Sequence, residues 1–137
     1  MSERTLRVVI LDSEGLARVG RHDREIGERL AAARDNGQRV ILPAVVAAEV
    51  ITGRPTDAGV QRAMERLVAE PISLELATRA GELRERAGRA RRKKRDLTVD
   101  AIVAAVAIAR APSVVLTADP DDLGLLIEGH DVRVIGL

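Results

Sequence analysis

Near its start the chain reads Leu6-Arg7-Val8-Val9-Ile10-Leu11, and Asp12-Ser13-Glu14-Gly15 follows directly. A short run of Val, Ile and Leu that ends in polar residues and a glycine is typical of a strand buried on both faces, followed by its exit loop. Similar but mostly weaker stretches recur along the chain at residues 39–42, 72–74, 113–116 and 132–135. A sheet of about five strands is therefore expected, with residues 72–74 as a short edge strand.

The segments between these strands have the periodicity of helices. Residues 23–34 place apolar side chains at helical spacing and end before Asn36-Gly37, a common helix terminus. Further helices are expected at residues 44–51, opened by Pro43, and at 57–70, 75–95, 97–111 and 119–128. Strands that alternate with helices predict an α/β fold with helices on both faces of a central parallel sheet. Residues 1–137 show no repeat or linker, so a single domain is expected.

The composition excludes several classes of protein. The 137 residues include no cysteine, which removes disulfide frameworks, thiolate metal sites and thiol nucleophiles. They also include no Phe, Trp or Tyr, so any contact with RNA must act through phosphates and shape instead of base stacking. Residues 1–7 carry charges where a signal peptide needs an apolar core, and the longest uncharged apolar run, residues 101–109, is about half a membrane span. A cytoplasmic protein without a membrane segment is expected.

Four acidic residues lie in otherwise uncharged segments. Asp12 and Asp119 follow the carboxyl ends of apolar strands, the edge at which open α/β sheets bind ligands. Glu49 and Asp100 are each the only charged residue over a long apolar stretch. Structural roles are available to three of them: a turn at Asp12, a helix cap at Asp119 and a helix-dipole contact at Asp100. Glu49 has no such local explanation, and an ionised carboxylate on an apolar helix is costly unless it is paired.

If these four carboxylates converge, they need a cation. Carboxylates a few Å apart cannot all stay ionised alone, and Mg²⁺ or Mn²⁺ with oxygen ligands removes the repulsion. The only histidines, His22 and His130, stand in polar loop contexts, which argues against a zinc site. An ion held by carboxylates can activate water for attack on a phosphodiester. The expected chemistry is metal-dependent phosphodiester hydrolysis.

The acidic residues also occur in an ordered set of motifs. The motifs are Asp12-Ser13 after the first strand, Pro43 to Val50 around Glu49, Thr98 to Ala105 around Asp100, and Leu116 to Leu123 with Asp119 and Asp122. In order and spacing, over nearly the whole chain, this set resembles the PIN-domain family. It is similar in particular to the VapC-like ribonuclease toxins of type II toxin–antitoxin modules.

The resemblance implies a PIN-like α/β/α sandwich and a Mg²⁺- or Mn²⁺-dependent endoribonuclease. It also implies a homodimer that acts on an RNA substrate and is inhibited by a cognate antitoxin protein. After the first aspartate the family more often has a small residue and then Ser or Thr, whereas this chain has Ser13 and then Glu14, an extra carboxylate. Carried over by position, the catalytic and metal-site residues are Asp12, Glu49, Asp100 and Asp119, and the supporting residues are Ser13, Thr117 and Asp122.

Residues 89–95, here called the basic segment, hold six cations in seven positions: Arg89, Arg91, Arg92, Lys93, Lys94 and Arg95. Residues 96–137 carry two positive and seven negative charges, so a near-neutral chain contains a basic segment beside an acidic region. This arrangement suits attraction of an RNA backbone toward a cation-loaded site. It equally suits an acidic antitoxin tail, and the sequence leaves both open.

Two other functions remain possible from the residues. A phosphoryl-transfer protein could use Asp12 as its nucleophile at a strand end, although such sites generally need a lysine near the phosphate. The only lysines, Lys93 and Lys94, belong to the basic segment. A catalytically silent PIN-like binding module is the second alternative, and the presence of all four acids argues against it.

Overall fold

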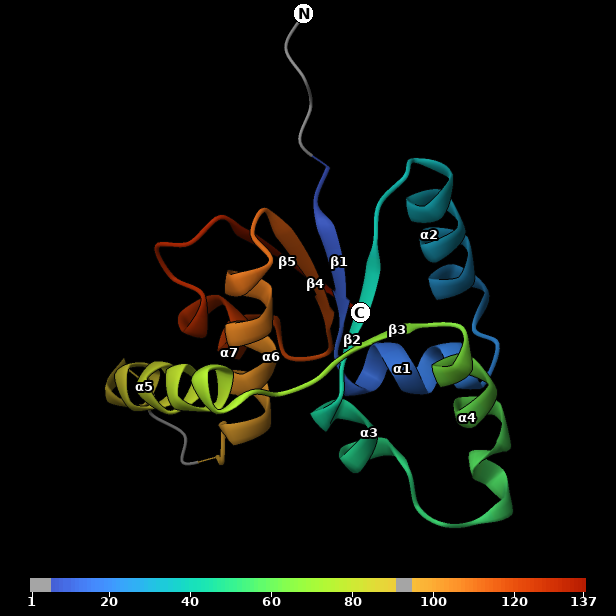
Figure 1. Ribbon diagram of the computed structural model, residues 1–137, viewed down its shortest axis with the longest axis horizontal. Helices are drawn as coiled ribbons and strands as arrows, with labels where there is room; N and C mark the ends of the chain where they lie inside the picture. Colours follow the sequence, from blue (N-terminus) through green and yellow to red (C-terminus); the bar gives the residue numbers. More distant parts are fainter. Residues whose placement is uncertain (1–5, 91–94) are drawn as a thin grey trace, which may run out of the picture.

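The computed structural model describes residues 6–90 and 95–137, and a five-stranded sheet forms its centre (Figure 1). Every pair of neighbouring strands is parallel, in the order β3-β2-β1-β4-β5. The predicted α/β fold with a central parallel sheet of five strands is confirmed. The strands are β1 (Val8–Leu11), β2 (Val40–Pro43), β3 (Val68–Glu70), β4 (Ser113–Thr117) and β5 (Val132–Gly136).

Helices flank the sheet on both sides. In Figure 1, α1, α2 and α4 lie to one side of the strands, and α5, α6 and α7 lie to the other. No helix within the two described ranges is both long and apolar enough to span a membrane. The helices are α1 (Ser13–Gly20), α2 (Arg24–Asp35), α3 (Val45–Val50), α4 (Ala58–Glu65), α5 (Leu74–Ala90), α6 (Thr98–Ala109) and α7 (Pro120–Leu126), with a 3-10 turn at Pro55–Asp57.

The core is built from aliphatic side chains of the central strands and of α6. Ile10 of β1 pairs in register with Ile41 of β2 and with Val115 of β4, and all three side chains are fully buried. Helix α6 packs between the sheet and α5, so nearly all of its residues from 101 to 107 are buried. Burial on several sides fixes α6 in position and orientation, and with it any side chain in its first turn.

The end of α1 crosses the start of α4 at two glycines. A Cβ at Gly59 would lie 2.2 Å from the carbonyl oxygen of Gly20, and a Cβ at Gly20 would lie 2.6 Å from Cγ2 of Val60. Only residues without a side chain allow the two backbones to approach this closely. This crossing packs α1, which begins just after β1, directly against α4.

The prediction of one helix over residues 57–70 is wrong. Helix α4 ends at Glu65, and Val68–Glu70 forms the edge strand β3, in which Val68 is paired with Ile41 of β2. Residues 72–74, predicted as the edge strand, are not a strand, and Leu74 begins α5. The sheet pairing satisfies the free backbone edge of β2, and this non-local gain outweighs the helical period of the local sequence.

Two local predictions around the strand ends also need correction. Residues 12–15, expected as a loop, instead begin α1, because the Asp12 side chain accepts a hydrogen bond from the backbone N–H of Gly15 (3.0 Å) and caps the helix. Pro43, expected to open a helix, is the last residue of β2, opposite Glu70 of β3. A proline lacks the N–H that a longer ladder would use, so it ends the strand.

Candidate active site

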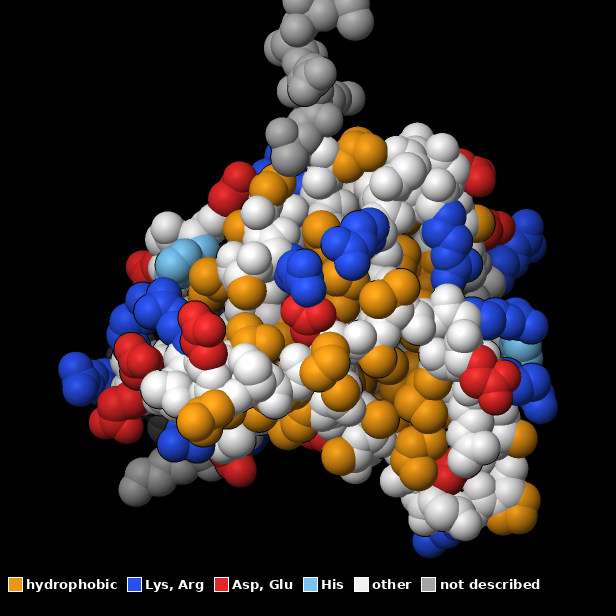
Figure 2. Space-filling model, in the orientation of Figure 1, with side chains coloured by type: hydrophobic (Ala, Val, Ile, Leu, Met, Phe, Trp, Pro, Cys, Tyr) orange, Lys and Arg blue, Asp and Glu red, His pale blue; other side chains and the backbone are white. Residues whose placement is uncertain are grey.

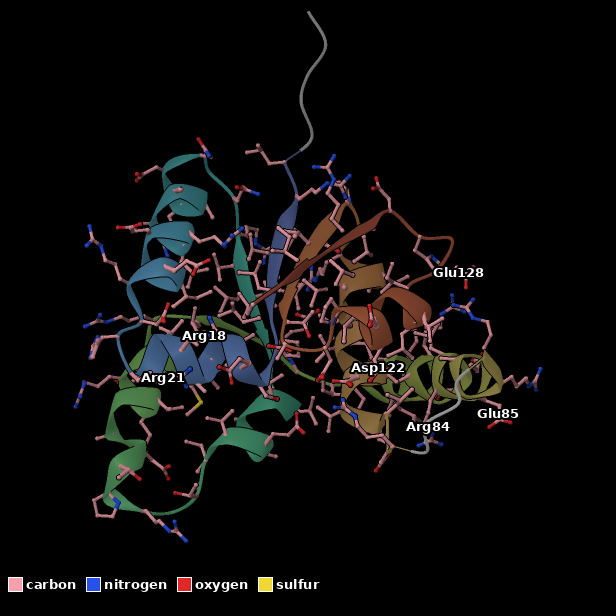
Figure 3. The ribbon with its side chains drawn as sticks, turned by 180° about the vertical axis from the view of Figure 1, so that it is seen from behind. Arg18, Arg21, Arg84, Glu85, Asp122 and Glu128 are labelled. Atoms are coloured by element: carbon pink, nitrogen blue, oxygen red, sulfur yellow. The ribbon has the colours of Figure 1, made fainter. Side chains whose placement is uncertain are left out.

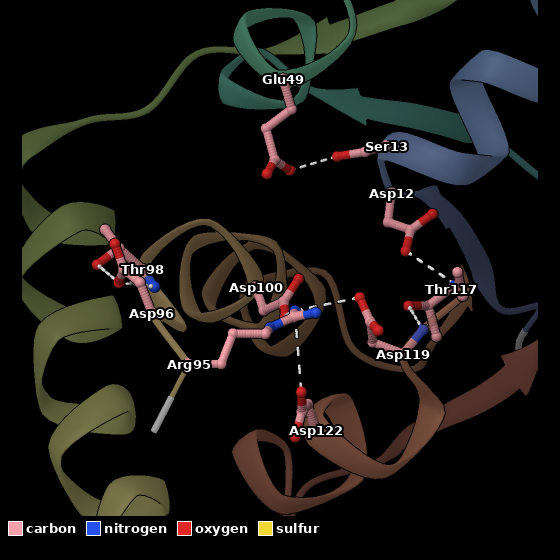
Figure 4. Close-up of polar contacts among 11 residues, drawn as sticks. Asp12, Ser13, Glu49, Arg95, Asp96, Thr98, Asp100, Thr117, Asp119 and Asp122 are labelled. Atoms are coloured by element: carbon pink, nitrogen blue, oxygen red, sulfur yellow. Dashed lines mark hydrogen bonds and ion pairs between the residues drawn. The ribbon is translucent and has the colours of Figure 1, made fainter. Parts of the chain in front are cut away.

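A cavity of about 470 Å³ opens beyond the carboxyl ends of β1 and β4. All four predicted metal-site acids line it, and they come from four separate segments (Figure 4). Asp12 directly follows β1 and Asp119 is the second residue after β4, while Glu49 belongs to α3 and Asp100 to α6. We call this cavity the acidic pocket; its lining residues are Asp12, Ser13, Glu14, Glu49, Arg95, Asp96, Val99, Asp100, Ala118 and Asp119.

Asp12 is held rigidly by its neighbours. Its side chain is buried, Oδ1 accepts from the N–H of Gly15, and Oδ2 accepts from the N–H of Ala118 at 3.2 Å. Burial raises the pKa of Asp12 above its ordinary value, and hydrogen bonds from Thr117, Gly15 and Ala118 partly oppose this rise. Asp12 thus performs the structural role of a helix cap and presents a fixed carboxylate to the acidic pocket.

Asp119 is the residue before α7, a position at which a capping role could have explained its presence. Its side chain, however, makes no capping hydrogen bond to α7. Its backbone N–H donates instead to the hydroxyl of Thr117 (2.9 Å), which is fully buried at the end of β4. The Asp119 carboxylate contacts the guanidinium of Arg95 at 3.1 Å. Thr117 therefore anchors the backbone that carries Asp119, and the carboxylate remains directed at the acidic pocket.

Asp100 is the most perturbed acid of the group. It lies in the first turn of α6 and is only 9% exposed. Burial raises its pKa from 3.8 to about 6, the charge of Arg95 opposes the rise, and the negative charges of Asp119 and Glu49 add to it. An ionised Asp100 in the metal-free protein is thus held in an environment that favours its neutral form.

Glu49 lies in a different environment from the one predicted. Helix α3 spans only six residues and buries only Val46, so Glu49 is exposed at the rim of the acidic pocket and not surrounded by apolar side chains. The Ser13 hydroxyl, at the start of α1, donates a hydrogen bond to the Glu49 carboxylate (Figure 4). Ser13 thereby links α1 to α3 across the pocket.

The extra carboxylate, Glu14, is already paired with one arginine of α1 and one that directly follows it. Arg18 and Arg21, both labelled beside α1 in Figure 3, bind Glu14 Oε1 at 3.0 and 2.8 Å. Hydrogen bonds from Arg21 and then Arg18 lower the pKa of Glu14. Asp121, in contrast, is exposed and does not line the acidic pocket. Glu14 therefore lines the acidic pocket but is paired with two arginines, and Asp121 lies outside the pocket.

The basic segment lies only partly within the described residues. Arg91, Arg92, Lys93 and Lys94 fall outside them, and Arg89 is exposed near the end of α5. Arg95, predicted with the others as an RNA contact, turns into the acidic pocket, where it contacts Asp100, Asp119 and, at 3.8 Å, Asp122 of α7. Figure 3 labels Asp122 on α7 and Arg84 on the neighbouring α5. A role of the basic segment in binding RNA stays a prediction.

The sequence reasoning missed a polar link at the entry to α6. The Thr98 hydroxyl donates to Asp96 (2.6 Å) and accepts from Arg84 of α5 (2.8 Å). The Thr98 N–H also donates to Asp96 (2.9 Å), and these hydrogen bonds lower the pKa of Asp96. The Asp-x-Thr spacing of residues 96–98 is a recognisable turn signal that could have predicted this contact. The link ties the start of α6 to α5 beside Arg95.

The donor chemistry of the acidic pocket fits a hard divalent ion. Carboxylate and hydroxyl oxygens line it, and no histidine does within the described ranges. Mg²⁺ and Mn²⁺ prefer such oxygen ligands. In residues 6–90 and 95–137, however, no three acidic or histidine side chains converge tightly enough to hold one ion as they stand. The residues present therefore provide the ligand atoms that such an ion prefers. To coordinate one ion, their carboxylates would need to move closer to one another.

The fold and pocket define a class of α/β protein in which carboxylates from separate segments surround a cavity at the carboxyl edge of a parallel sheet. The chain belongs to the PIN domain family, whose model matches residues 9–123. No curated protein sequence matches the chain.

Solved structures share this fold at low sequence identity. A chain of VapBC2 from Rickettsia felis, bound to a DNA fragment from its promoter, has a TM-score of 0.75 at 14% identity, covering 95% of this chain and 98% of that one. A chain of FitAB bound to the IR36 DNA fragment has a TM-score of 0.62 at 19% identity, with 94% of each chain covered. A chain of FitAcB from Neisseria gonorrhoeae has 0.58 at 18%, with 94% and 97% covered. These likenesses confirm the PIN-like fold.

Proposed function

We propose that this protein is an endoribonuclease that hydrolyses RNA phosphodiester bonds with Mg²⁺ or Mn²⁺. The observation that carries the proposal is that Asp12, Glu49, Asp100 and Asp119, from four separate segments of a PIN domain, line one pocket. Like charges placed together at one solvent-open edge repel one another without a cation. A pocket of this kind is more useful for binding metal and phosphate than for stabilising the fold.

The chain's own residues would position the reacting groups. A divalent ion bound among the four carboxylates would polarise the phosphodiester and lower the pKa of the attacking water. Two backbone N–H groups orient Asp12, while Thr117 anchors Asp119 and Ser13 orients Glu49. These are the supporting roles proposed for Ser13 and Thr117. Asp122, whose carboxylate lies 3.8 Å from the Arg95 guanidinium, would add a further negative charge beside the four acids.

The bonding of Asp12 favours this function over phosphoryl transfer through Asp12 itself. Both of its carboxylate oxygens accept backbone hydrogen bonds, and the side chain is 4% exposed. Aspartate phosphorylation sites generally need a lysine near the phosphate, and among the described residues no lysine lines the acidic pocket. A buried carboxylate that accepts two backbone hydrogen bonds is held in one orientation, which suits a metal ligand.

We further propose that the protein is the toxin of a toxin–antitoxin pair. The PIN-like chains named above come from the VapBC2 and FitAB complexes, and the basic segment provides cations for an RNA backbone or an acidic antitoxin tail. Induced expression should stop growth of a bacterial host, and co-expression of the protein encoded next to it should restore growth. If expression of the Asp100→Asn variant also stops growth, the proposal that toxicity comes from nuclease activity is contradicted.

A homodimer is also proposed, and an exposed apolar surface supports it. Leu74 is 84% exposed and Val68 of the edge strand is more than half exposed. Figure 2 shows hydrophobic side chains gathered across the middle of this face, over β3 and between α4 and α5. Exposed apolar patches commonly mark protein contacts. Light scattering should give a dimer mass, lost in Leu74→Glu and kept in the control Leu6→Glu; a monomeric wild-type chain would refute the proposal.

Cleavage of an RNA panel by purified protein tests the enzymatic proposal. Cleavage should require Mg²⁺ or Mn²⁺ and stop in EDTA. Asp12→Asn, Asp100→Asn and Asp119→Asn should each reduce the rate by more than about 100-fold, since even outer-shell partners of a metal contribute up to that factor. Asp35→Asn, an exposed acid at the end of α2, is the matched control. Undiminished cleavage in EDTA, or by Asp100→Asn, would reject this function.

A further inference from the structure

Arg95 places a positive charge inside the acidic pocket. A single nitrogen, Nη2, contacts Asp100 Oδ2, lies 3.1 Å from Asp119 Oδ2 and lies 3.8 Å from Asp122 Oδ2 (Figure 4). Three carboxylates from α6, from the loop after β4 and from α7 thus face one cationic atom. This is the charge arrangement that a bound metal ion would experience.

The position of Arg95 on the chain lets it enter and leave. Its side chain is 47% exposed, so it is not locked into the core, and it lies outside the regular helices, three positions before Thr98. The backbone that carries Asp100 and Asp119 is fixed more firmly, because α6 is buried and Thr117 anchors the N–H of Asp119. Displacing Arg95 therefore requires a local change and leaves the sheet and helices in place.

An arginine and a divalent ion cannot both occupy this position. The nitrogen of Arg95 stands 3.1 Å from Asp119, whereas Mg²⁺ binds oxygen at about 2.0 to 2.1 Å. Around the guanidinium, no three acidic side chains of the described residues converge closely enough for one ion. The carboxylates would close around the ion only after Arg95 withdraws. Both cations also neutralise the same negative charges, so binding of one weakens binding of the other.

We propose that Arg95 is a built-in competitor for the metal ion, which holds the acidic pocket in its metal-free form and must leave Asp100 and Asp119 before the ion binds. This inference rests on the proposed metal-dependent function. The metal-binding form is then only a fraction of the free protein, and the apparent affinity equals the intrinsic affinity multiplied by that fraction. If Arg95 occupies the pocket in roughly 90 to 99% of metal-free molecules, the dissociation constant rises about 10- to 100-fold.

Mn²⁺ binding by the full-length chain tests the proposal without reference to RNA cleavage. Titration calorimetry at pH 8 should show that Arg95→Gln binds Mn²⁺ at least about tenfold more tightly than the wild type. Arg95→Lys should lie between the two, because the ammonium group retains the positive charge on a shorter side chain, which reaches less far toward the three carboxylates. Arg29→Gln, which removes one exposed cation on α2 away from the acidic pocket, should match the wild type.

A second measurement follows the metal-free state. In EDTA at pH 8, Arg95→Gln should unfold at a lower temperature than the wild type and than Arg29→Gln, because three carboxylates lose their cation. Saturating Mn²⁺ should reduce this difference, since the ion replaces the lost charge. An unchanged melting temperature in EDTA would show that Arg95 does not occupy the pocket in solution, and would overturn the inference.

The outcomes separate this inference from the proposed function. If the wild type binds Mn²⁺ and Asp100→Asn does not, but Arg95→Gln and Arg95→Lys bind no more tightly than the wild type, competition is refuted and the metal site stands. If neither the wild type nor Arg95→Gln binds Mn²⁺ more tightly than Asp100→Asn does, the proposed metal-dependent function fails and this inference fails with it.

Discussion

Replacing Asp100 by Asn should stabilise the metal-free protein at high pH. The Asp100 side chain is almost completely buried, and its pKa is raised to about 6. A carboxyl group whose pKa is higher in the folded protein than in the unfolded chain stabilises the fold while it is protonated. That contribution is fully present below pH 3.8 and is lost as the pH rises through 6. Asparagine stays neutral across this whole range.

The size of the effect follows from the two pKa values. The difference between 3.8 and about 6 corresponds to on the order of 3 kcal/mol between an ionised and a neutral Asp100. We therefore expect Asp100→Asn to raise the free energy of unfolding by about 1 to 3 kcal/mol at pH 8, and to change it little at pH 4. In thermal unfolding this corresponds to roughly 3 to 10 °C for a domain of this size.

Thermal and urea unfolding in EDTA, at pH 4 and pH 8, measure this difference directly. With Mn²⁺ at pH 8 the wild type should instead unfold at a higher temperature than Asp100→Asn, because the ion stabilises only a protein that binds it. Asp35→Asn, at an exposed position, serves as the control at both pH values. If Asp100→Asn unfolds the protein at pH 8, or changes stability equally at both pH values, then Asp100 is a structural residue of α6 and the reasoning from its burial is wrong.

Two further results are expected. Gly59→Ala should lower the free energy of unfolding in urea by about 1 to 3 kcal/mol, because its Cβ would lie 2.2 Å from the carbonyl oxygen of Gly20. The control Gly27→Ala on α2, where a Cβ would meet nothing within 4 Å, should raise it by about 0.5 to 1 kcal/mol. Equal effects of the two substitutions would contradict the close α1–α4 crossing. Replacing residues 91–94 by Ser while keeping Arg95 should flatten the slope of log RNA affinity against log salt concentration by roughly 2 to 3 units. If the slope is unchanged and only antitoxin binding weakens, the basic segment binds protein and not RNA.

The sequence by itself determined the features that depend on local pattern and residue type. Buried parallel strands need continuous aliphatic runs, so β1 and β4 were recognisable, and an acid directly after such a strand necessarily lies at its carboxyl edge. The apolar stretch of α6 likewise marked Asp100 as an isolated charge. Connectivity of the strands and helices then limited the fold to an α/β arrangement with Asp12 and Asp119 at one edge of the sheet.

Features that depend on contacts between distant segments were decided only by the tertiary structure. Residues 68–70 continue a helical pattern, yet they form β3 because β2 offers a free edge. Glu49 seemed to belong to a buried helix, but α3 is short and packs only Val46 inward. Neither outcome is encoded within the segment itself, because each depends on which surface another segment leaves uncovered.

Arg95 shows the same limit at the pocket itself. In the sequence it is the last of six cations in the basic segment, and nothing in residue type distinguishes it from its neighbours. In the folded chain Asp119, 24 positions away, lies opposite its guanidinium, and Asp122 and Asp100 stand beside it. The sequence therefore determined which charges exist and at which edge of the sheet the acids gather. Only the packing of α6 against β4 and of α7 against α6 decided that one cation enters the acidic pocket, because the Coulomb energy depends on distances that the fold alone sets.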